Sequence, residues 1–309
     1  MLKVSAFTNG AAQPVERIVP HSWIHAISPS EDELARLQDC GIATDLLLHV
    51  LDFEERSRVI KRGDIVYLVI HLPYKEQVDS EIPYATAPIS VVLLPEYLIT
   101  IESREIGLFE KLVENPPSGL APHNKTQFVL NLILLAGLDY LKCLHEINMA
   151  IDQTEDHLQR SLRNREVLQL LNYQKSLVYF STALNSIELM LEKLRKGGFI
   201  EISSGDQELA EDALIEIRQA VYLVDIAQSI LTQMMDAFAS IVSNNLNTVM
   251  KFLAAITIII SVPTLIASIY GMNVPLPGES AAQTFIYLLA LSILLSIAVI
   301  IVFLRKDWL

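Results

Sequence analysis

Apolar positions along the chain follow three successive patterns. Up to about residue 122, short apolar runs bounded by turn residues alternate with short helical periods, which predicts a small α/β domain. From 123 to 250 the helical period continues with few breakers, which predicts long helices. Residues 251–309 hold two uncharged apolar runs, Phe252–Ile269 and Thr284–Leu304, of 18 and 21 residues. Each run is long enough to cross a bilayer core of about 30 Å, so we expect two transmembrane helices there.

The predicted α/β domain, residues 1–122, contains strand and helix signals. Three apolar runs predict buried strands, at Ile65–Ile70, Ile89–Leu94 and Tyr97–Ile101. Ser28, Pro29 and Glu31 have the order of an N-cap, a first helical residue and a third helical residue, so we expect a helix from Pro29 to about Asp39. Gly41 ends it, a second short helix is expected after Thr44, and the domain is expected to end near Pro116-Pro117.

The predicted long-helix region, residues 123–250, contains three helices. Thr126–Leu162 and Arg165–Lys196 carry helical periodicity, and the third helix runs from Gln207 without Gly or Pro for 56 residues, about 84 Å, to Val262. We expect this third helix, the stalk helix, to continue unbroken into the first transmembrane run. Its apolar seam is Leu214, Ile217, Val221, Val224, Gln228, Leu231, Met235, Phe238 and Val242. The seam suits packing against neighbouring subunits, or against other helices of the same chain in a bundle.

One apolar run in the long-helix region also resembles a transmembrane segment. Phe128–Leu135 is short for a span, and the polar residues Asn131 and Asp139 interrupt the apolar pattern around it. We therefore expect this run to be core of the soluble region.

The flanking charges predict how the two transmembrane helices are oriented. Lys251 precedes the first, Arg305 and Lys306 follow the second, and the connecting segment 271–283 has no basic residue. Because basic residues stay on the cytoplasmic side, we expect an external loop, a basic cytoplasmic tail and both termini in the cytoplasm.

Polar residues recur along the first transmembrane helix at steps of three and four. They form one helical stripe: Asn247, Thr257, Ser261, Thr264 and Ser268, with Met250 and Ala254 filling its gaps. Hydroxyls of this kind either bond to a helix backbone or line a water-filled path. A single helix cannot enclose a path, so the second interpretation requires several copies in a ring with the stripe inward.

Charge and cysteine content narrow the possible partners. The net charge is −13 over 309 residues, and residues 1–250 hold 34 acidic against 20 basic residues. This balance argues against nucleic acid and favours divalent cations as partners. Cys40 and Cys143 lie far apart and fit free thiols in a reducing compartment, and the N-terminus has no apolar signal sequence. No P-loop or other ATP-binding motif is visible, so we expect no ATP requirement.

One junction identifies a family resemblance. Tyr270-Gly271-Met272-Asn273 follows the first of two C-terminal transmembrane helices, and the chain ends Arg305-Lys306-Asp307-Trp308-Leu309. In this arrangement the chain resembles the CorA family of magnesium channels, as do its segments Gln174–Phe180 and Leu189–Leu194. The resemblance implies a homo-oligomer, expected to be a pentamer, in the inner or plasma membrane. It also implies Mg²⁺ as the transported and regulatory ion, with Co²⁺ or Ni²⁺ as further ions.

The resemblance also assigns roles to residues. It implies a selectivity entrance at Gly271, Met272 and Asn273, although the tripeptide also fits a simple tight loop. It places the cytoplasmic constriction at Asn247, Met250 and Leu253, with Thr257, Ser261 and Thr264 further along the path; Ser261 stands where the family has a second bulky apolar residue.

A regulatory metal site is the last implication of the resemblance. The family pairs an Asp at the position of Asp212 with an acidic residue of the neighbouring subunit, but here that second position is His49, with Asp52 three residues on. Histidine is a poor Mg²⁺ ligand, so the site is weakened or moves to Asp52. Asp212 also fits an ordinary exposed residue. Asp236, on the face of Asn247, is expected to attract cations below the gate.

Three other functions compete with magnesium transport. A membrane-anchored enzyme lacks a site, because no G-x-S-x-G, H-E-x-x-H or C-x-x-C motif occurs and His21 and His25 lie in a predicted strand. A non-conducting membrane sensor has no need of a polar stripe. A CorA-like zinc transporter shares the architecture and is the main alternative.

Overall fold

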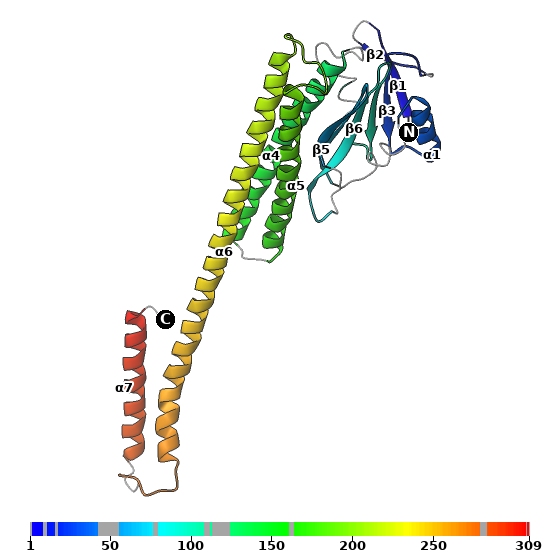
Figure 1. Ribbon diagram of the computed structural model, residues 1–309. Helices are drawn as coiled ribbons and strands as arrows, with labels where there is room; N and C mark the ends of the chain where they lie inside the picture. Colours follow the sequence, from blue (N-terminus) through cyan, green and yellow to red (C-terminus); the bar gives the residue numbers. More distant parts are fainter. Residues whose placement is uncertain are drawn as a thin grey trace. The chain divides into compact units, whose positions relative to one another are not determined.

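The computed structural model describes residues 2–8, 11–15, 18–42, 56–76, 80–107, 112, 124–160, 164–278, 283–306 and 308. The chain divides into two compact units, residues 1–232 and 233–309. The first unit contains a sheet and long helices, and the second contains two apolar helices (Figure 1). An α/β domain followed by long helices and an apolar C-terminal pair confirms the predicted fold class.

The described part of the first unit contains one seven-stranded sheet in the order β2-β1-β3-β7-β6-β5-β4. The strands are β1 (Leu2–Thr8), β2 (Ala11–Pro14), β3 (Trp23–Ile27), β4 (Arg58–Arg62), β5 (Ile65–Lys75), β6 (Tyr84–Leu93) and β7 (Leu98–Glu102). β3 and β7 pair in parallel, and the other neighbouring strands pair antiparallel. The three predicted strands are therefore present, and β5 and β6 are longer than their apolar runs suggested.

Both faces of the sheet are buried. On one face, Ile24, Tyr67 and Ile99 pack in a cluster with Leu37 of α1 (Glu31–Asp39). The opposite face is covered by α4 (Lys125–Arg160) and α5 (Asn164–Arg195), and the ring of Trp23 meets that of Phe128 of α4 edge to face at 5.2 Å. Burial on both sides explains why these strands read as continuous apolar runs.

Helix α1 begins two residues later than the sequence pattern indicated. Ser30, and not Ser28, is its N-cap: the Ser30 hydroxyl accepts a hydrogen bond from the Glu33 N–H, and the Glu33 carboxylate accepts one from the Ser30 N–H. Ser28 instead has a φ of 42°, in the left-handed region. Ser28 with Glu31 and Ser30 with Glu33 have the same capping-box spacing, and the structure uses the second pair, so Pro29 lies before the helix. The predicted helix after Thr44 and the domain end at Pro116-Pro117 lie outside the described residues.

Helices α4 and α5 occur close to where the periodicity placed them, and α4 belongs to the soluble core. Of the most apolar 18-residue stretch of α4, 56% is buried, and the side chains of Phe128 and Ile133 are fully buried. Asn131 is satisfied inside the helix by donating its amide hydrogen to the Gln127 carbonyl at 2.9 Å. The apolar run of α4 is thus a core element, as expected.

Helix α6 (Gln207–Tyr270) is the predicted stalk helix and extends past Val262 to Tyr270, with Pro263 inside it. The first part of its seam is buried within the same chain, at Leu214, Ile217, Val224 and Leu231. Ile217 packs against Gly137 of α4, where an added Cβ would lie 3.1 Å from Glu216 Cβ. Of the two interpretations of the seam, packing inside the chain holds for these residues.

A charged clamp joins the same part of α6 to α5. Arg218 donates hydrogen bonds to Glu188 at 2.7 Å and to Glu192 at 2.8 Å, so one guanidinium engages two successive turns of α5. Hydrogen bonds to these carboxylates raise the pKa of Arg218 further.

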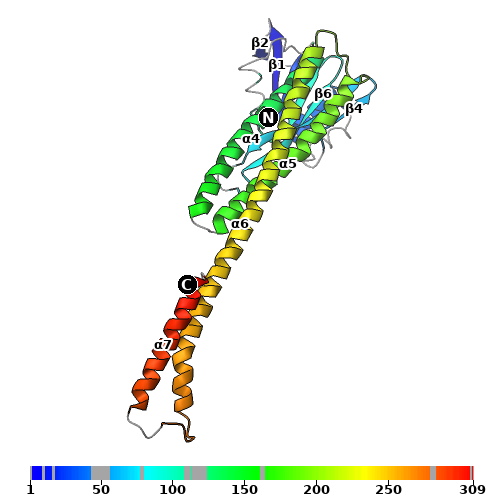
Figure 2. The same ribbon diagram turned by 90° about the vertical axis from the view of Figure 1, so that its left-hand side faces the viewer.

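The second unit is a helical hairpin. The C-terminal part of α6 and α7 (Thr284–Arg305) run in opposite directions side by side, as Figures 1 and 2 show. Most of their side chains are exposed in a single chain, because the apolar windows of both helices are only 6% buried.

Candidate ion pathway and metal sites

Three described helices are long and apolar enough to cross a membrane: α4, α6 and α7. The three helices differ in how much of their apolar surface is buried. Helix α4 is enclosed by sheet and helices, whereas α6 and α7 leave large apolar side chains such as Leu265, Leu294 and Phe285 exposed. Exposed apolar surface on this scale indicates a lipid or subunit environment.

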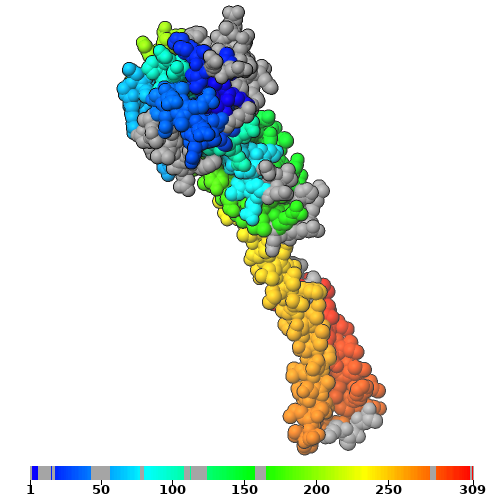
Figure 3. All heavy atoms as spheres, turned by 90° about the vertical axis from the view of Figure 1, so that its right-hand side faces the viewer, coloured from blue at the N-terminus to red at the C-terminus, as the bar shows by residue number. Residues whose placement is uncertain are grey.

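The membrane part of α6 has one side toward α7 and one side away from it. Its buried and half-buried positions are Ala255, Ile256, Ile259, Val262 and Ile266, and all but Ile256 lie on the side toward α7. Because successive residues turn by about 100°, the polar stripe lies on the far side of the helix. Thr257, Ser261 and Thr264 are all exposed there. Figure 3 shows atoms of α7 along one side of this part of α6, and the α6 atoms that face the viewer are uncovered.

The hydroxyls of the stripe bond to the backbone of their own helix. Thr257 donates to the Leu253 carbonyl at 2.8 Å, Ser261 to that of Thr257 at 2.7 Å, and Thr264 to that of Ile260 at 2.9 Å. Each hydroxyl therefore donates its hydrogen to the backbone of its own helix, and its oxygen lone pairs remain available as acceptors. The two interpretations of the stripe are thus compatible, because a hydroxyl bonded in this way still offers an acceptor to water.

The residues assigned to the constriction, Asn247, Met250 and Leu253, lie about three, two and one turns before Thr257, the first hydroxyl of the stripe. Asn247 is exposed, and Met250 and Leu253 are 57% and 53% exposed. Met250 lies on the stripe and Leu253 at its edge. Further along, Pro263 has no N–H to offer the Ile259 carbonyl, which weakens the helix beside the stripe.

The loop after α6 begins at Gly271. The Gly271 N–H donates to the Ala267 carbonyl at 2.9 Å, and a Cβ at Gly271 would lie 3.3 Å from that oxygen. A side chain at this position would therefore crowd the Ala267 carbonyl, and the φ of Gly271 is not in the left-handed region. Met272 and Asn273 are exposed, and the Asn273 carboxamide makes no hydrogen bond to the described residues.

The C-terminal tail folds back on α7. The Trp308 N–H donates to the Phe303 carbonyl at 3.0 Å, and the two rings stack with centroids 5.4 Å apart. Arg305 and Lys306 end the helix with exposed side chains.

The predicted regulatory residues are not brought together in the described structure. Asp212 and Asp236 are exposed on α6, and His49 and Asp52 lie outside the described residues. Across the described part of the chain, no group of three or more His, Cys, Asp or Glu side chains could hold a metal ion.

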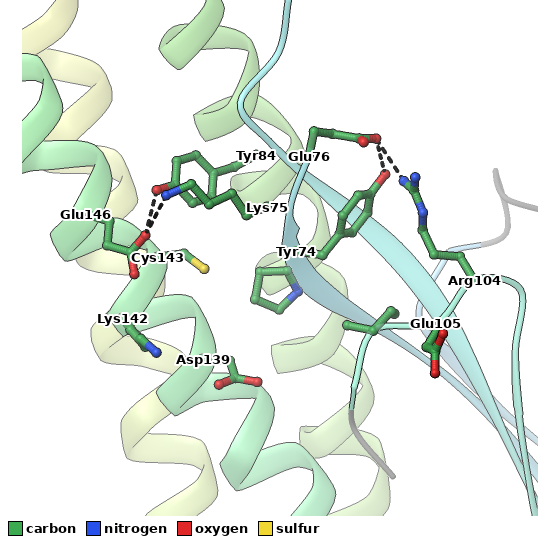
Figure 4. Close-up of a pocket in the computed structure, with 12 residues that line it drawn as sticks. Tyr74, Lys75, Glu76, Tyr84, Arg104, Glu105, Asp139, Lys142, Cys143 and Glu146 are labelled. Carbon is green, nitrogen blue, oxygen red and sulfur yellow. Dashed lines mark hydrogen bonds and ion pairs between the residues drawn. The ribbon is translucent and has the colours of Figure 1, made fainter. Parts of the chain in front are cut away.

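The structure adds two polar clusters that the sequence did not indicate. Buried His25 lies with its Nε2 3.5 Å from the Glu102 carboxylate and its Nδ1 2.8 Å from the Thr100 hydroxyl. A charged hollow lies between β5 and α4, and Figure 4 shows its carboxylates Glu76 and Glu146 paired with neighbouring side chains. The partners in each cluster are tens of residues apart in sequence, so a local pattern cannot reveal them.

An α/β unit followed by a hairpin of apolar helices, with hydroxyls on the uncovered side of one helix, defines a membrane protein with two C-terminal spans. The family model described as "CorA-like Mg2+ transporter protein" matches residues 20–306, and the chain belongs to this family.

Relatives agree with this assignment. The cobalt/magnesium transport protein CorA of Methanocaldococcus jannaschii is 28% identical over 293 residues, covering 93% of this chain and 90% of that protein. The complete structure of the CorA magnesium transporter from the same organism matches with a TM-score of 0.86 at 24% identity, over 100% of this chain and 99% of that one. The ZntB cytoplasmic domain from Vibrio parahaemolyticus matches 78% of this chain and 98% of its own, with a TM-score of 0.62 and 13% identity.

Proposed function

We propose that this chain forms a channel for Mg²⁺ influx, which also admits Co²⁺ or Ni²⁺. Family membership supports divalent-cation transport, and the relative from M. jannaschii is named for cobalt and magnesium. The main observation that supports a channel is the line of exposed hydroxyls on the side of α6 that faces away from α7. A helix surface of this kind is stable in a membrane when it faces water.

The stripe requires a homo-oligomer. One chain leaves Thr257, Ser261 and Thr264 uncovered, so a ring of identical chains with α6 innermost encloses them, and α7 then faces lipid. We propose the pentamer implied by the family resemblance. Native mass spectrometry of the protein in detergent tests it, and a monomer that still conducts would contradict it.

Selectivity is proposed at the loop Gly271-Met272-Asn273. Mg²⁺ releases its water reluctantly, so a ring of exposed Asn273 carboxamides suits the hydrated ion through hydrogen bonds to its water shell. Below it, the hydroxyl oxygens of the stripe continue as acceptors for the same waters. A non-labile hexammine complex of cobalt resembles hydrated Mg²⁺ in size and should block this entrance.

The gate is proposed at Met250 and Leu253, near Asn247. Apolar side chains of this size close a water-filled path by excluding water. Ser261 adds no second apolar constriction, so the closed gate is short. Opening needs no ATP, because two charges that move inward gain about 4.6 kcal/mol at 100 mV.

The proposed location is the cell membrane, inner or plasma, with both termini in the cytoplasm. Lys251, Arg305 and Lys306 lie at one end of the α6–α7 hairpin by sequence, and the loop 271–283 without basic residues lies at the other. The corresponding domain assignment is a cytoplasmic α/β domain (1–122), a long-helix region (123–250) and a pore domain (251–309).

Regulation by cytoplasmic Mg²⁺ is proposed at Asp212 together with His49 or Asp52 of a neighbouring subunit, and Asp236 attracts cations below the gate. Removing the Asp212 carboxylate is expected to raise uptake at millimolar internal Mg²⁺, and His49→Asp is expected to strengthen inhibition, because a carboxylate is a better Mg²⁺ ligand than imidazole. Uptake against internal Mg²⁺ measures both effects, with Asp225→Ala, another exposed carboxylate of α6, as the control. Superimposed curves would reject the Asp212 sensor, and a shift with Asp52→Ala alone would move the site to that residue.

A CorA-like zinc transporter is the second candidate, since the ZntB cytoplasmic domain has the same fold as the first unit. The test of the main proposal is Mg²⁺ uptake by Asn273→Ala, which should lose selective uptake while the oligomer remains intact. Val274→Ala, which changes the neighbouring exposed residue, should transport normally. Unchanged uptake by Asn273→Ala would show that the loop does not select.

A further inference from the structure

The loop between α6 and α7 joins two helix ends that lie at the same end of the hairpin, as Figures 1 and 2 show. Of its described residues, 271–278, all but the half-buried Leu276 are exposed. A loop with so few packed side chains depends on hydrogen bonds for a fixed conformation. The bonds that hold it therefore decide where its side chains lie.

One such bond connects the loop to Thr284, the first residue of α7. The Thr284 hydroxyl donates a hydrogen bond to the Gly278 carbonyl at 2.5 Å. Gly278 has a φ of 84°, and an added Cβ would lie 3.1 Å from Thr284 Oγ1. The left-handed backbone and the close approach of the threonine both favour glycine at this position.

A second bond connects the loop to Tyr270, the last residue of α6. The Tyr270 hydroxyl donates to the Pro277 carbonyl at 3.4 Å, which is a longer and weaker contact. Because Pro277 and Gly278 are adjacent, the two hydroxyls hold one dipeptide between the end of α6 and the start of α7. We call Tyr270, Pro277, Gly278 and Thr284 the loop clip.

The loop clip encloses residues 271–276. At the start of this segment, the Met272 N–H donates to the Ile269 carbonyl at 3.3 Å, so the backbone continues from the end of α6. Within the segment, the ring of Pro275 restricts φ and removes conformational freedom. The segment is therefore short, held at both ends and stiff.

The proposed selectivity residue Asn273 lies inside this segment. Its carboxamide makes no hydrogen bond to the described residues, so its position follows from the backbone that carries it. A ring of carboxamides binds the water shell of an ion well only when each copy is held in the same place, because a displacement of about 1 Å already weakens a preorganised site.

We propose that Thr284, Gly278 and Tyr270 are positioning residues of the ion entrance, with the Thr284 hydroxyl contributing most. This inference rests on the proposed function, because it assigns to the loop clip the task of holding Asn273 against a hydrated divalent cation. When the Thr284 hydroxyl is absent, the loop is released at its α7 end, and the carboxamides bind the hydrated ion more weakly.

Three threonine variants test the loop clip. Thr284→Val removes the hydroxyl and keeps the shape of the side chain, whereas Thr284→Ser keeps the hydroxyl. Thr182→Val is the matched control, because it removes an exposed hydroxyl of α5 that also bonds to a backbone carbonyl, at 2.9 Å. Tyr270→Phe, which loses only the phenol hydroxyl, tests the same clip from its other side if Thr284→Val does not assemble.

The first measurement is the rate of chymotrypsin cleavage between residues 270 and 283 of the full-length protein in detergent, with the cut located by mass spectrometry. Thr284→Val should be cleaved about fivefold faster than the wild type, the factor that one net hydrogen bond contributes. Thr284→Ser and Thr182→Val should match the wild type, and Tyr270→Phe should show a smaller increase. Equal rates for the wild type, Thr284→Val and Tyr270→Phe would overturn the proposal.

The second measurement is the concentration of the hexammine complex of cobalt that halves Mg²⁺ uptake into liposomes. Thr284→Val should raise this concentration about fivefold, and Thr284→Ser should restore the wild-type value. Faster cleavage with unchanged block would show that the clip stabilises the loop without positioning Asn273, and would overturn the proposal. If the wild type is not blocked and Asn273→Ala transports normally, the proposed entrance itself is wrong, whatever the cleavage rates show.

Discussion

The two units use the same apolar residue types for opposite purposes. In the first unit, residues 1–232, the apolar window of α4 is 56% buried, whereas the windows of α6 and α7 in the second are 6% buried. By length and composition all three helices qualify as membrane spans. Hydropathy therefore detects apolar helices, but only the burial of their side chains distinguishes a helix of a soluble core from one that contacts lipid or other subunits.

The largest expected difference in unfolding free energy is between truncating a buried leucine of the first unit and truncating an exposed leucine of the second. Leu177→Ala removes a fully buried side chain of α5 and should cost about 2–5 kcal/mol of unfolding free energy. Leu265→Ala removes a side chain that is 63% exposed on α6 and should cost much less. Denaturant unfolding in detergent, followed by circular dichroism, measures both. Equal losses would show that Leu265 is packed as tightly as Leu177.

A charge placed at an exposed leucine distinguishes lipid from water. Leu294 of α7 is 66% exposed and Leu189 of α5 is 63% exposed. Leu294→Arg should cost about 3 kcal/mol of insertion and deplete the protein from the membrane fraction, because a membrane core rejects arginine. Leu189→Arg should be tolerated. If both variants reach the membrane equally well, α7 does not span it.

Protonation of histidine can change the stability of the first unit only, because residues 233–309 contain no histidine. Burial lowers the pKa of His71 to about 4, and its Nδ1 contacts the Ser57 hydroxyl at 3.1 Å. The unfolded state binds a proton near pH 6.5 and the folded state only near 4, so stability falls as the pH drops between these values, by about 2–3 kcal/mol. His71→Gln should flatten this dependence in pH-dependent unfolding. An unchanged slope would assign it to other groups.

The smallest expected difference in stability is between substitutions at the starts of helices α6 and α7. At the start of α6, the Asp206 carboxylate accepts hydrogen bonds from the Ser203 hydroxyl at 2.7 Å and from Gln127 Nε2 at 2.8 Å, which lower its pKa. Gln283, before α7, makes no capping bond with its side chain. Asp206→Ala should cost about 1–2 kcal/mol and Gln283→Ala close to none, measured as thermal unfolding.

The Asp206 contribution also has a defined pH window. Since its pKa is lowered on folding, the stabilisation is present above the ordinary aspartate value of about 4 and is lost as the pH falls through the folded value. Asp206→Asn should remove this acid-sensitive part. A variant that loses stability equally at all pH values would indicate a purely steric role.

Much of the fold follows from local patterns in the sequence. Continuous apolar runs indicated β5, β6 and β7, uninterrupted helical periods indicated α4, α5 and α6, and Asn131 separated a core helix from a span. The start of α1 was predicted wrongly, because Ser28-Pro29 and Ser30-Glu33 offer competing caps and the structure uses the second. Whether the seam of α6 faces its own chain or a neighbour depends on tertiary packing, which periodicity alone does not determine.

The site divides in the same way. The hydroxyl stripe and the Gly271-Met272-Asn273 loop are local features, so spacing and family resemblance could propose them from the sequence alone. The groups around Glu76 and Glu146 join residues 28 and 71 positions apart, Glu76 to Arg104 and Lys75 to Glu146, and became visible only in the folded chain.

The central claim is that the second unit conducts Mg²⁺ when several chains assemble. Its most direct test is flux into liposomes that carry the purified protein and a Mg²⁺-sensitive dye, with an inside-negative potential and no ATP. We expect Mg²⁺ entry that depends on the membrane potential and is lost in Asn273→Ala. Entry of Zn²⁺ driven by a pH gradient, without Mg²⁺ entry under either condition, would contradict it.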